Sequence, residues 1–356
     1  MVPGQSHRLS PGAPHFLYFC VKCLLSSLLM ETTKETELCF PEFLNTSCRK
    51  PKHTYSEAVL IYIVMPVTSV VTVILNLLVI VSISHFKQLH TATNFLILSL
   101  AFSDFIVGVL MCFHIFITDG CWALGDIVCV AFSVFDFTGT SASVGTMVLI
   151  SIDRYVAICE PLHYSSKITV TKVTVCICLC WVFSFLYNCL LIHDNLDQLD
   201  RYISCFGECI IVVDHIAGVA DIIITFFAPV TVIIVLYMRV FMVAVSQARA
   251  MRSHITSVTH SRTMFAKKSE LKAARTLGVV IVVFLTCLCP YFISSLVGES
   301  SLFTVSSVPL QNWLLSFNSC LNPIIYAFCS PWYRKSVKLI FTFKILEPDS
   351  CEANVF

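Results

Sequence analysis

The chain has 356 residues and a net charge of +1; 57% of its residues are hydrophobic and only 13% are charged. Soluble domains carry about a quarter charged residues, so most of this chain must face an apolar solvent. The small net charge gives no attraction to nucleic acid, and the 19 cysteines form no zinc-ligand cluster in a polar segment.

The first 29 residues can be interpreted in two ways. Residues 16–29 are typical of a signal-peptide core behind a weakly basic start. Alternatively, residues 1–29 are a non-native upstream extension, with Met30 as the natural start. We expect the second, because the first membrane helix can itself direct insertion.

Seven segments are long and apolar enough to cross a bilayer, which takes about 20 residues. The predicted spans cover residues 58–83, 95–117, 127–152, 173–192, 216–238, 276–297 and 302–328. The second, third and fifth spans each contain one aspartate: Asp104, Asp136 and Asp221. Short connections and the lack of a tandem repeat predict an all-α membrane protein, a single seven-transmembrane helix bundle over residues 58–328.

Basic residues set the orientation of this bundle. Residues 239–275 hold eight Lys and Arg residues, whereas residues 193–214 hold five carboxylates and one arginine, Arg201. Loops rich in Lys and Arg lie in the cytoplasm, so residues 1–57 are predicted to be extracellular. Asn45 begins an Asn-Thr-Ser glycosylation motif on that side. Residues 329–356 alternate basic and apolar side chains at their start, which predicts a short amphipathic helix on membrane lipid and a cytoplasmic tail.

Each predicted span carries a short motif in a fixed order. The motifs are Asn76, the LAFSD sequence ending at Asp104, the sequence Asp153-Arg154-Tyr155, Trp181, Pro229, Pro290 and the NPIIY sequence from Asn322 to Tyr326. Over residues 58–340 this order resembles the rhodopsin-like G-protein-coupled receptors. Residues 86–97 and 272–278 further resemble the trace-amine-associated receptors, and departures at Ser330 and Tyr333 indicate a divergent, fish-type member.

The resemblance implies a binding site for a small cationic amine. Asp136 lies 18 residues before Arg154, the spacing at which amine receptors bind the ligand ammonium. A carboxylate in a low-dielectric pocket also needs a counter-charge on physical grounds alone. The alternative is a hydrogen-bonded structural aspartate.

Asp221 lies eight residues before Pro229, and the resemblance places it in the same pocket. Some fish trace-amine-type receptors carry this second aspartate, which accompanies diamine recognition, so we expect a diamine or polyamine such as cadaverine or putrescine. The alternative is a single-amine ligand, with Asp221 accepting a hydroxyl or bonding to the backbone.

Aromatic side chains near these carboxylates can form a cage for an ammonium group, or can simply pack the core. The candidates are Phe132, Phe137, Tyr291, Phe292 and Trp313. Many amine receptors brace the ligand aspartate with a tyrosine seven residues before the seventh-helix proline, whereas this chain has Ser316. This departure weakens the inference of ordinary monoamine geometry.

The resemblance also implies an allosteric sodium site and an inner activation switch. The candidate sodium ligands are Asp104, Ser143, Asn318, Ser319 and Asn322, whose oxygens suit a hard cation, although a water-filled polar network would use the same groups. We expect no other cofactor. The switch residues are Asp153, Arg154, Tyr155, Tyr237, Glu270, Phe284, Asn322, Pro323 and Tyr326, with Glu270 pairing with Arg154 in the inactive state.

One departure concerns signalling itself. The family usually has Cys-Trp-x-Pro in the sixth helix, whereas this chain has Leu288 in place of the tryptophan and keeps Phe284. A receptor-like protein with impaired coupling is therefore an alternative. Otherwise the resemblance implies a stimulatory or olfactory heterotrimeric G protein, cyclic AMP, and a multi-pass protein of a sensory cell membrane.

Outside the cell, the resemblance implies disulfides between Cys129 and Cys209 and between Cys48 and Cys205, while Cys39 and Cys121 stay unassigned.

Other function classes are disfavoured. A transporter would show internal repeats or broken helices. An enzyme would need a metal or nucleophile cluster, but His114 and His215 stand isolated in the sequence, without HExxH or GxSxG motifs.

Overall fold

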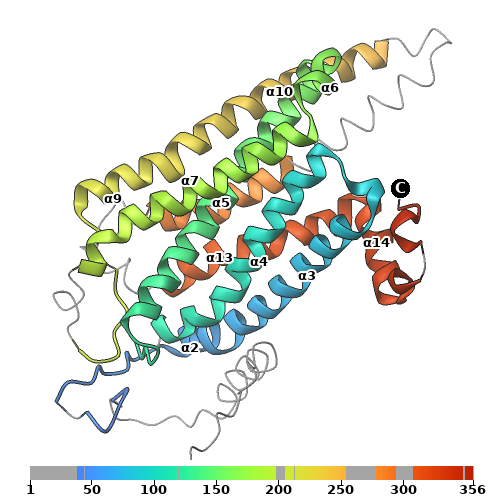
Figure 1. Cartoon of the computed structure of the whole chain (residues 1–356). Helices are drawn as coiled ribbons and strands as arrows, with labels where there is room; N and C mark the ends of the chain where they lie inside the picture. Colours follow the sequence, from blue (N-terminus) through green and yellow to red (C-terminus); the bar gives the residue numbers. More distant parts are fainter. Residues whose placement is uncertain are drawn as a thin grey trace, which may run out of the picture.

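The computed structural model describes residues 38–43, 45–118, 120–197, 205–211, 213–253, 278–293, 308–347 and 349–355. Long helices lie side by side in one bundle (Figure 1), and the described chain forms no strand beyond two isolated bridges. Five described helices are long and apolar enough to cross a membrane, and residues Gly278–Ile293 form a shorter apolar helix. The predicted all-α bundle is therefore confirmed.

The helices follow the predicted spans in order. The first combines α2 (Tyr55–Val59), η1 (Leu60–Val64) and α3 (Met65–His85), and is followed by η2 (Lys87–Leu89), α4 (Ala92–Thr118), α5 (Asp126–Cys159), η3 (Pro161–His163), α6 (Tyr164–Lys167) and α7 (Val170–Asp197). The fifth combines α9 (His215–Ile222), η4 (Ile223–Phe227) and α10 (Ala228–Ser253). After Gly278–Ile293 come α13 (Val308–Cys329), α14 (Pro331–Phe341), η6 (Lys344–Leu346) and η7 (Ser350–Glu352).

The fifth helix contains a wide turn next to a candidate ligand residue. The π-helical turn η4 begins two residues after Asp221 and ends two residues before Pro229. Proline has no N–H to donate to the carbonyl four residues earlier, so a regular helical bond is missing there. A π turn inserts an extra residue and changes the direction in which the preceding side chains point. The local sequence thus sets the orientation of Asp221.

Small residues let the first helices approach one another closely. A Cβ added at Gly108 of α4 would lie 2.9 Å from the Thr72 side chain of α3. Asn76 of α3 donates to the backbone oxygen of Ser319 in α13 at 2.9 Å. In α7, Trp181 donates to Ser99 of α4 at 3.1 Å. Such close approach and interhelical hydrogen bonding are the usual means of holding membrane helices together.

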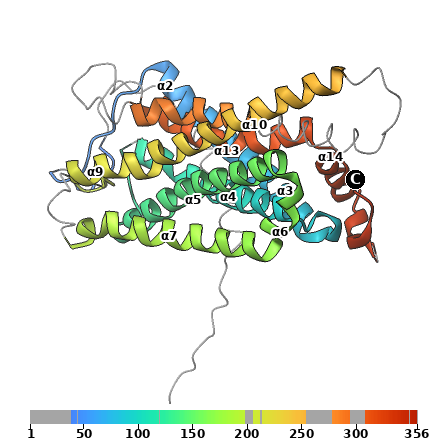
Figure 2. The ribbon, with the colours of Figure 1, turned by 90° about the horizontal axis from the view of Figure 1, so that it is seen from above.

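The amphipathic helix after the last span is present as predicted. The helix α14 lies at an angle to the long helices (Figure 2). It buries Trp332, Tyr333 and Ser336, and the Tyr333 hydroxyl donates to the backbone oxygen of Leu75 at 3.3 Å. Burial raises the pKa of Tyr333 to about 12, so the phenol remains a neutral donor.

Three disulfides hold the outer end together. The structure joins Cys129 to Cys209 and Cys48 to Cys205, the two pairs expected, and also joins Cys39 to Cys121. Between the N-terminal segment and the loop before α9, the Phe206 N–H donates to the Thr46 oxygen at 2.6 Å. Gly207 has a φ of +101°, and a Cβ there would lie 2.5 Å from the Phe40 ring, so only glycine fits.

The Cys39–Cys121 bond can be checked directly. We expect non-reducing digestion and mass spectrometry of the intact protein to recover a peptide linking these two cysteines, alongside the Cys48–Cys205 and Cys129–Cys209 links. Reduction before digestion is the control and should abolish all three cross-linked species. Recovery of Cys39 and Cys121 as alkylated free thiols would contradict the assignment.

Candidate functional site

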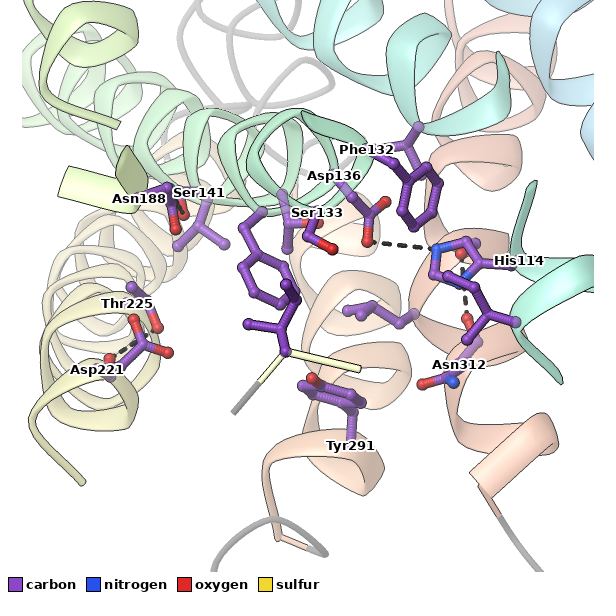
Figure 3. A pocket seen from close by; sticks show the side chains of 18 of the residues that line it. His114, Phe132, Ser133, Asp136, Ser141, Asn188, Asp221, Thr225, Tyr291 and Asn312 are labelled. Carbon is purple, nitrogen blue, oxygen red and sulfur yellow. Dashed lines mark hydrogen bonds and ion pairs between the residues drawn. The ribbon is translucent and has the colours of Figure 1, made fainter. Parts of the chain in front are cut away.

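The two candidate ligand carboxylates line one cavity of about 280 Å³. Its walls come from α4, α5, α7, α9, η4, the Gly278–Ile293 helix and α13, and Cys209 and Ile211 line it from the outer loop. Figure 3 shows Asp136 with His114 at one side of this cavity and Asp221 with Thr225 at the other. The structure therefore places the two carboxylates predicted from the sequence in one cavity, at opposite sides of it.

Asp136 has a partner that the sequence reasoning missed. The Nε2 atom of His114, in α4, lies 3.3 Å from Oδ2 of Asp136, in α5. Both side chains are mostly buried, at 16% and 13% exposed. The sequence analysis assigned no partner to His114. An ionisable residue within an apolar span usually faces the bundle interior, and that rule applied to His114 as much as to the aspartates.

Asp221 has a different partner. The hydroxyl of Tyr187, in α7, donates to Oδ1 of Asp221 at 3.1 Å. Thr225, one turn further along the helix, donates its hydroxyl to the backbone oxygen of Asp221, and not to its side-chain carboxylate. Asp221 is half-buried, so it retains room for a second partner from the cavity.

The cavity wall is negative on balance. Among the described residues that line it, Asp136 and Asp221 are acidic, His114 is the one basic side chain, and none is Lys or Arg. A charge in a low-dielectric interior is costly unless an opposite charge accompanies it. The wall thus favours a positively charged occupant.

Aromatic rings form much of the remaining wall. Phe132, Phe137, Tyr291 and Phe292 all line the cavity. The Phe292 ring stacks on Phe226 at 4.3 Å between centroids, and the Tyr291 ring meets the Phe292 ring edge-on at 5.3 Å. Electron-rich faces of such rings attract cations.

Trp313 lies elsewhere, contrary to expectation. Its indole N–H donates to the Thr68 hydroxyl at 3.2 Å, and its ring stacks on Phe317 and packs beside Ile61 and Met65. Asn312 and Ser316 of α13 face the cavity instead. Because consecutive helical residues are about 100° apart, the residue after Asn312 points away from that face, toward the first helix.

The candidate sodium ligands meet below this cavity. Asp104 is fully buried, and its Oδ2 accepts a hydrogen bond from Asn322 Nδ2 at 2.7 Å. Four further buried oxygens have no hydrogen-bond partner among the described residues: Asp104 Oδ1, Ser143 Oγ, Asn318 Oδ1 and Asn322 Oδ1. A cavity of about 10 Å³ adjoins Ser143, Asn318 and Ser319. Oxygen ligands of this kind fit a hard cation.

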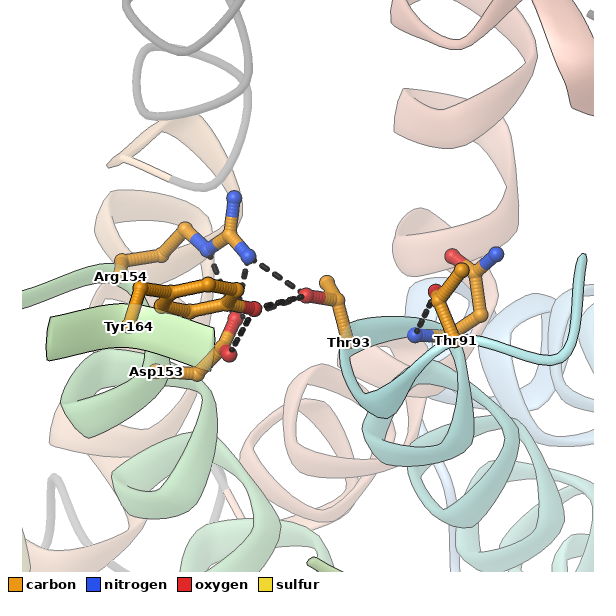
Figure 4. A network of polar contacts seen from close by, with 6 residues as sticks. Thr91, Thr93, Asp153, Arg154 and Tyr164 are labelled. Atoms are coloured by element: carbon orange, nitrogen blue, oxygen red, sulfur yellow. Dashed lines mark hydrogen bonds and ion pairs between the residues drawn. The ribbon is translucent and has the colours of Figure 1, made fainter. Parts of the chain in front are cut away.

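Arg154, the arginine of the predicted inner switch, is held in a closed polar network (Figure 4). Arg154 donates to its neighbour Asp153 and to the Thr93 hydroxyl, the latter at 2.6 Å. Tyr164 of α6 donates to the other oxygen of Asp153 at 2.8 Å. Sequence reasoning missed Thr93 and Tyr164, because only the folded chain brings them to Arg154. The expected partner Glu270 lies outside the described residues.

The other switch residues occupy the inner half of the bundle. Phe284 and Leu288 are almost fully buried and line the small cavity beside Ser143. Pro323 lies inside α13, and Tyr155 packs against Ile158 and Val240. The hydroxyls of Tyr237 and Tyr326 are buried without hydrogen-bond partners among the described residues.

Asn45, the predicted glycosylation residue, is exposed at the outer end, where its side chain is accessible.

Comparisons with known proteins agree with this geometry. Residues 75–326 match the family described as 7 transmembrane receptor (rhodopsin family). The chain is 37% identical to trace amine-associated receptor 13c of Danio rerio, with 90% of this chain and 96% of that protein covered. It is 37% identical to trace amine-associated receptor 9 of Rattus norvegicus, covering 90% and 98%, and 36% identical to trace amine-associated receptor 6 of Homo sapiens, covering 93% and 98%.

The three relatives cover 90% or more of the chain. They identify a receptor and not an enzyme, as expected, and such a receptor binds small-molecule ligands and G proteins. The chain therefore belongs to the trace amine-associated receptors, rhodopsin-family G-protein-coupled receptors that cross the cell membrane several times with the N-terminus outside.

Proposed function

We propose that this receptor recognises small diammonium ligands, with cadaverine and putrescine as the simplest representatives. The observation that carries the proposal is one cavity with two separated carboxylates, Asp136 and Asp221, and no Lys or Arg among its described lining residues. One ammonium binds Asp136, and the other binds Asp221 at the opposite side (Figure 3).

Size and electrostatics favour the same class of ligand. A volume of about 280 Å³ lies just below the usual range for ligand pockets, which suits a short aliphatic chain and disfavours bulky amines. An ammonium at each end would neutralise both carboxylates, whereas a monoamine leaves one charge without a cationic partner. The apolar and aromatic wall between the carboxylates contacts the methylene groups of the chain.

One contact favours a second candidate, a receptor for single amines. The Tyr187 hydroxyl already satisfies one oxygen of Asp221, so Asp221 could serve structurally while Asp136 alone binds an ammonium. The two candidates differ in one respect: only the diamine function requires the negative charge of Asp221.

The charge of Asp221 can be removed while its shape is kept. We expect Asp221→Asn to weaken cadaverine potency about 10-fold to 100-fold, because a buried charge pair is worth about 2 kcal/mol or more, and to leave 2-phenylethylamine nearly unaffected. Asp136→Asn should weaken both amines at least as much. Dose–response curves for cyclic AMP in transfected cells measure this.

Tyr187→Phe is the matched control, since it removes the hydroxyl and keeps the Asp221 charge; cadaverine should remain active on it. Equal cadaverine potency in wild type and Asp221→Asn, at equal surface expression, would contradict the diamine function and favour the single-amine candidate. A receptor that binds amines but gives no cyclic AMP would instead point to impaired coupling at Leu288.

We further propose that a sodium ion binds at Asp104 and acts allosterically. Asp104, Ser143, Asn318 and Asn322 would hold it, with Ser319 beside them, and the orphaned buried oxygens of these side chains support the fit. The ion supplies a positive charge that stabilises the compact, inactive arrangement.

Sodium sensitivity tests this site separately from the ligand cavity. We expect NaCl to lower agonist affinity in the wild type more than KCl at equal ionic strength, and Asp104→Asn to remove that difference. Radioligand displacement on membranes provides the measurement. An Na⁺ effect of the same size in the variant would rule the site out.

On the cytoplasmic side, we propose coupling to a stimulatory or olfactory G protein, with Arg154 as the residue released on activation. The network of Arg154 with Asp153, Thr93 and Tyr164 ties α5 to α4 and α6 and holds the arginine away from a G-protein helix. Activation would break it.

Weakening that network should raise basal signalling. Hydrogen bonds to charged groups contribute about 1.5–3 kcal/mol, and every 1.4 kcal/mol is about tenfold, so Thr93→Val should raise basal nucleotide exchange on the G protein about tenfold or more. Thr91→Val is the control, since Thr91 lies apart from Arg154 and accepts only from the Asn94 backbone (Figure 4). Equal basal exchange in wild type and Thr93→Val would refute the restraint.

A further inference from the structure

The contact between His114 and Asp136 places a titratable base where the ligand ammonium is expected to bind. The imidazole Nε2 lies 3.3 Å from the carboxylate, and the Phe132 ring packs edge-on against the imidazole at 5.2 Å. Both His114 and Asp136 line the ligand cavity. The imidazole therefore occupies one side of the carboxylate that the ligand also needs.

Among the described residues that line the cavity, His114 is the one side chain whose ordinary pKa lies near neutral pH, and the carboxylates Asp136 and Asp221 line the same cavity. Asp136 faces it from α5, Asn312 and Ser316 line the cavity from α13, and Tyr291 lines it from the Gly278–Ile293 helix. Tyr62 of η1 packs near the outer part of α4. The tyrosine phenols titrate near pH 10. Imidazole is the basic side chain that ordinarily changes charge between about pH 5 and pH 8.

We propose that His114 is the resident counter-ion of Asp136: its imidazolium neutralises the carboxylate in the empty receptor and gives up one proton to solvent when a ligand ammonium binds. This inference rests on the proposed function only in taking Asp136 as the ammonium site, and it holds for diamines and monoamines alike.

The physical reason is competition for one carboxylate. In a low-dielectric cavity, an ammonium and an imidazolium beside the same carboxylate would leave a net positive charge and repel each other. The imidazolium is the stronger acid, because imidazole titrates near pH 6.5 and alkyl amines near pH 10. The imidazole therefore loses the proton, stays in place as a neutral group and leaves the ammonium paired with Asp136.

Proton release makes affinity depend on pH in a defined direction. Below the pH at which His114 titrates in the empty receptor, each unit of acidification should raise the Kd for an amine by a factor approaching about ten. Above that pH the Kd should become constant. His114 would thus make the receptor insensitive to amines in acidic surroundings, although the amines themselves are fully charged there.

The test measures equilibrium binding of labelled cadaverine, and in parallel labelled 2-phenylethylamine, to membranes carrying the full-length receptor between about pH 5.5 and pH 8. The key variant is His114→Gln, whose side-chain amide nitrogen can replace Nε2 as a hydrogen-bond donor but does not titrate. We expect a steep pH dependence of the Kd in the wild type and a nearly flat one in His114→Gln.

Several outcomes would overturn the proposal. A flat wild-type profile would show that His114 is neutral throughout, and an unchanged slope in His114→Gln would assign the titration to a carboxylate. If the variant fails to fold, calorimetry of the wild type in two buffers of different ionisation enthalpy still counts the protons released: about one near pH 6 supports the proposal, and none refutes it.

The two amines separate this inference from the ligand assignment. If 2-phenylethylamine binds with the expected pH dependence and cadaverine does not bind at all, the diamine function fails and the role of His114 stands. If cadaverine binds with no pH dependence, the role of His114 fails and the diamine function stands.

Discussion

The cost of a buried carboxylate in a membrane bundle governs this receptor. Asp136 and Asp221 lie on helices that cross an apolar solvent, where a charge survives only with a partner. The empty protein satisfies them differently, with an imidazole for Asp136 and a phenol hydroxyl for Asp221. Neither partner carries a permanent positive charge, so the cavity retains an attraction for cations that a permanently charged Lys or Arg partner would have cancelled.

The same constraint explains how the outer and inner ends cooperate with the cavity. Three disulfides fix the N-terminal segment and the outer loop over the bundle, and this loop contributes Cys209 and Ile211 to the cavity wall. Below the cavity, Asp104 and its neighbouring oxygens form a second polar cluster in the bundle core, and Arg154 is held by a third at the inner end. All three clusters bond α4 to a neighbouring helix, through His114 with Asp136, Asp104 with Asn322 and Thr93 with Arg154.

The sequence predicted much of this architecture because its evidence is local. Apolar runs fix the spans, Lys and Arg fix the orientation, and single residues such as Pro229 and Asn322 fix the register of their helices. The position of the cavity carboxylates could also be predicted, since an aspartate in an apolar span usually faces the interior of the bundle. The disulfides of Cys129 and Cys48 followed from the family resemblance.

What could not be predicted depends on how helices rotate against one another. Trp313 and Asn312 are neighbours in sequence, yet only Asn312 faces the cavity, and no local pattern decides between them. The contacts of Tyr187 with Asp221 and of Thr93 with Arg154 join helices far apart in the chain. The partnership of Cys39 with Cys121 depends on the path of two outer segments whose sequences carry no pairing signal.

The central claim is that one small cavity holds a ligand by both ends. An experimental structure of the receptor with bound cadaverine tests it most directly. The account predicts one ligand nitrogen within about 3 Å of an Asp136 oxygen and the other within about 3 Å of an Asp221 oxygen. A ligand that reaches Asp136 alone, with Asp221 still bonded only to Tyr187, would contradict it.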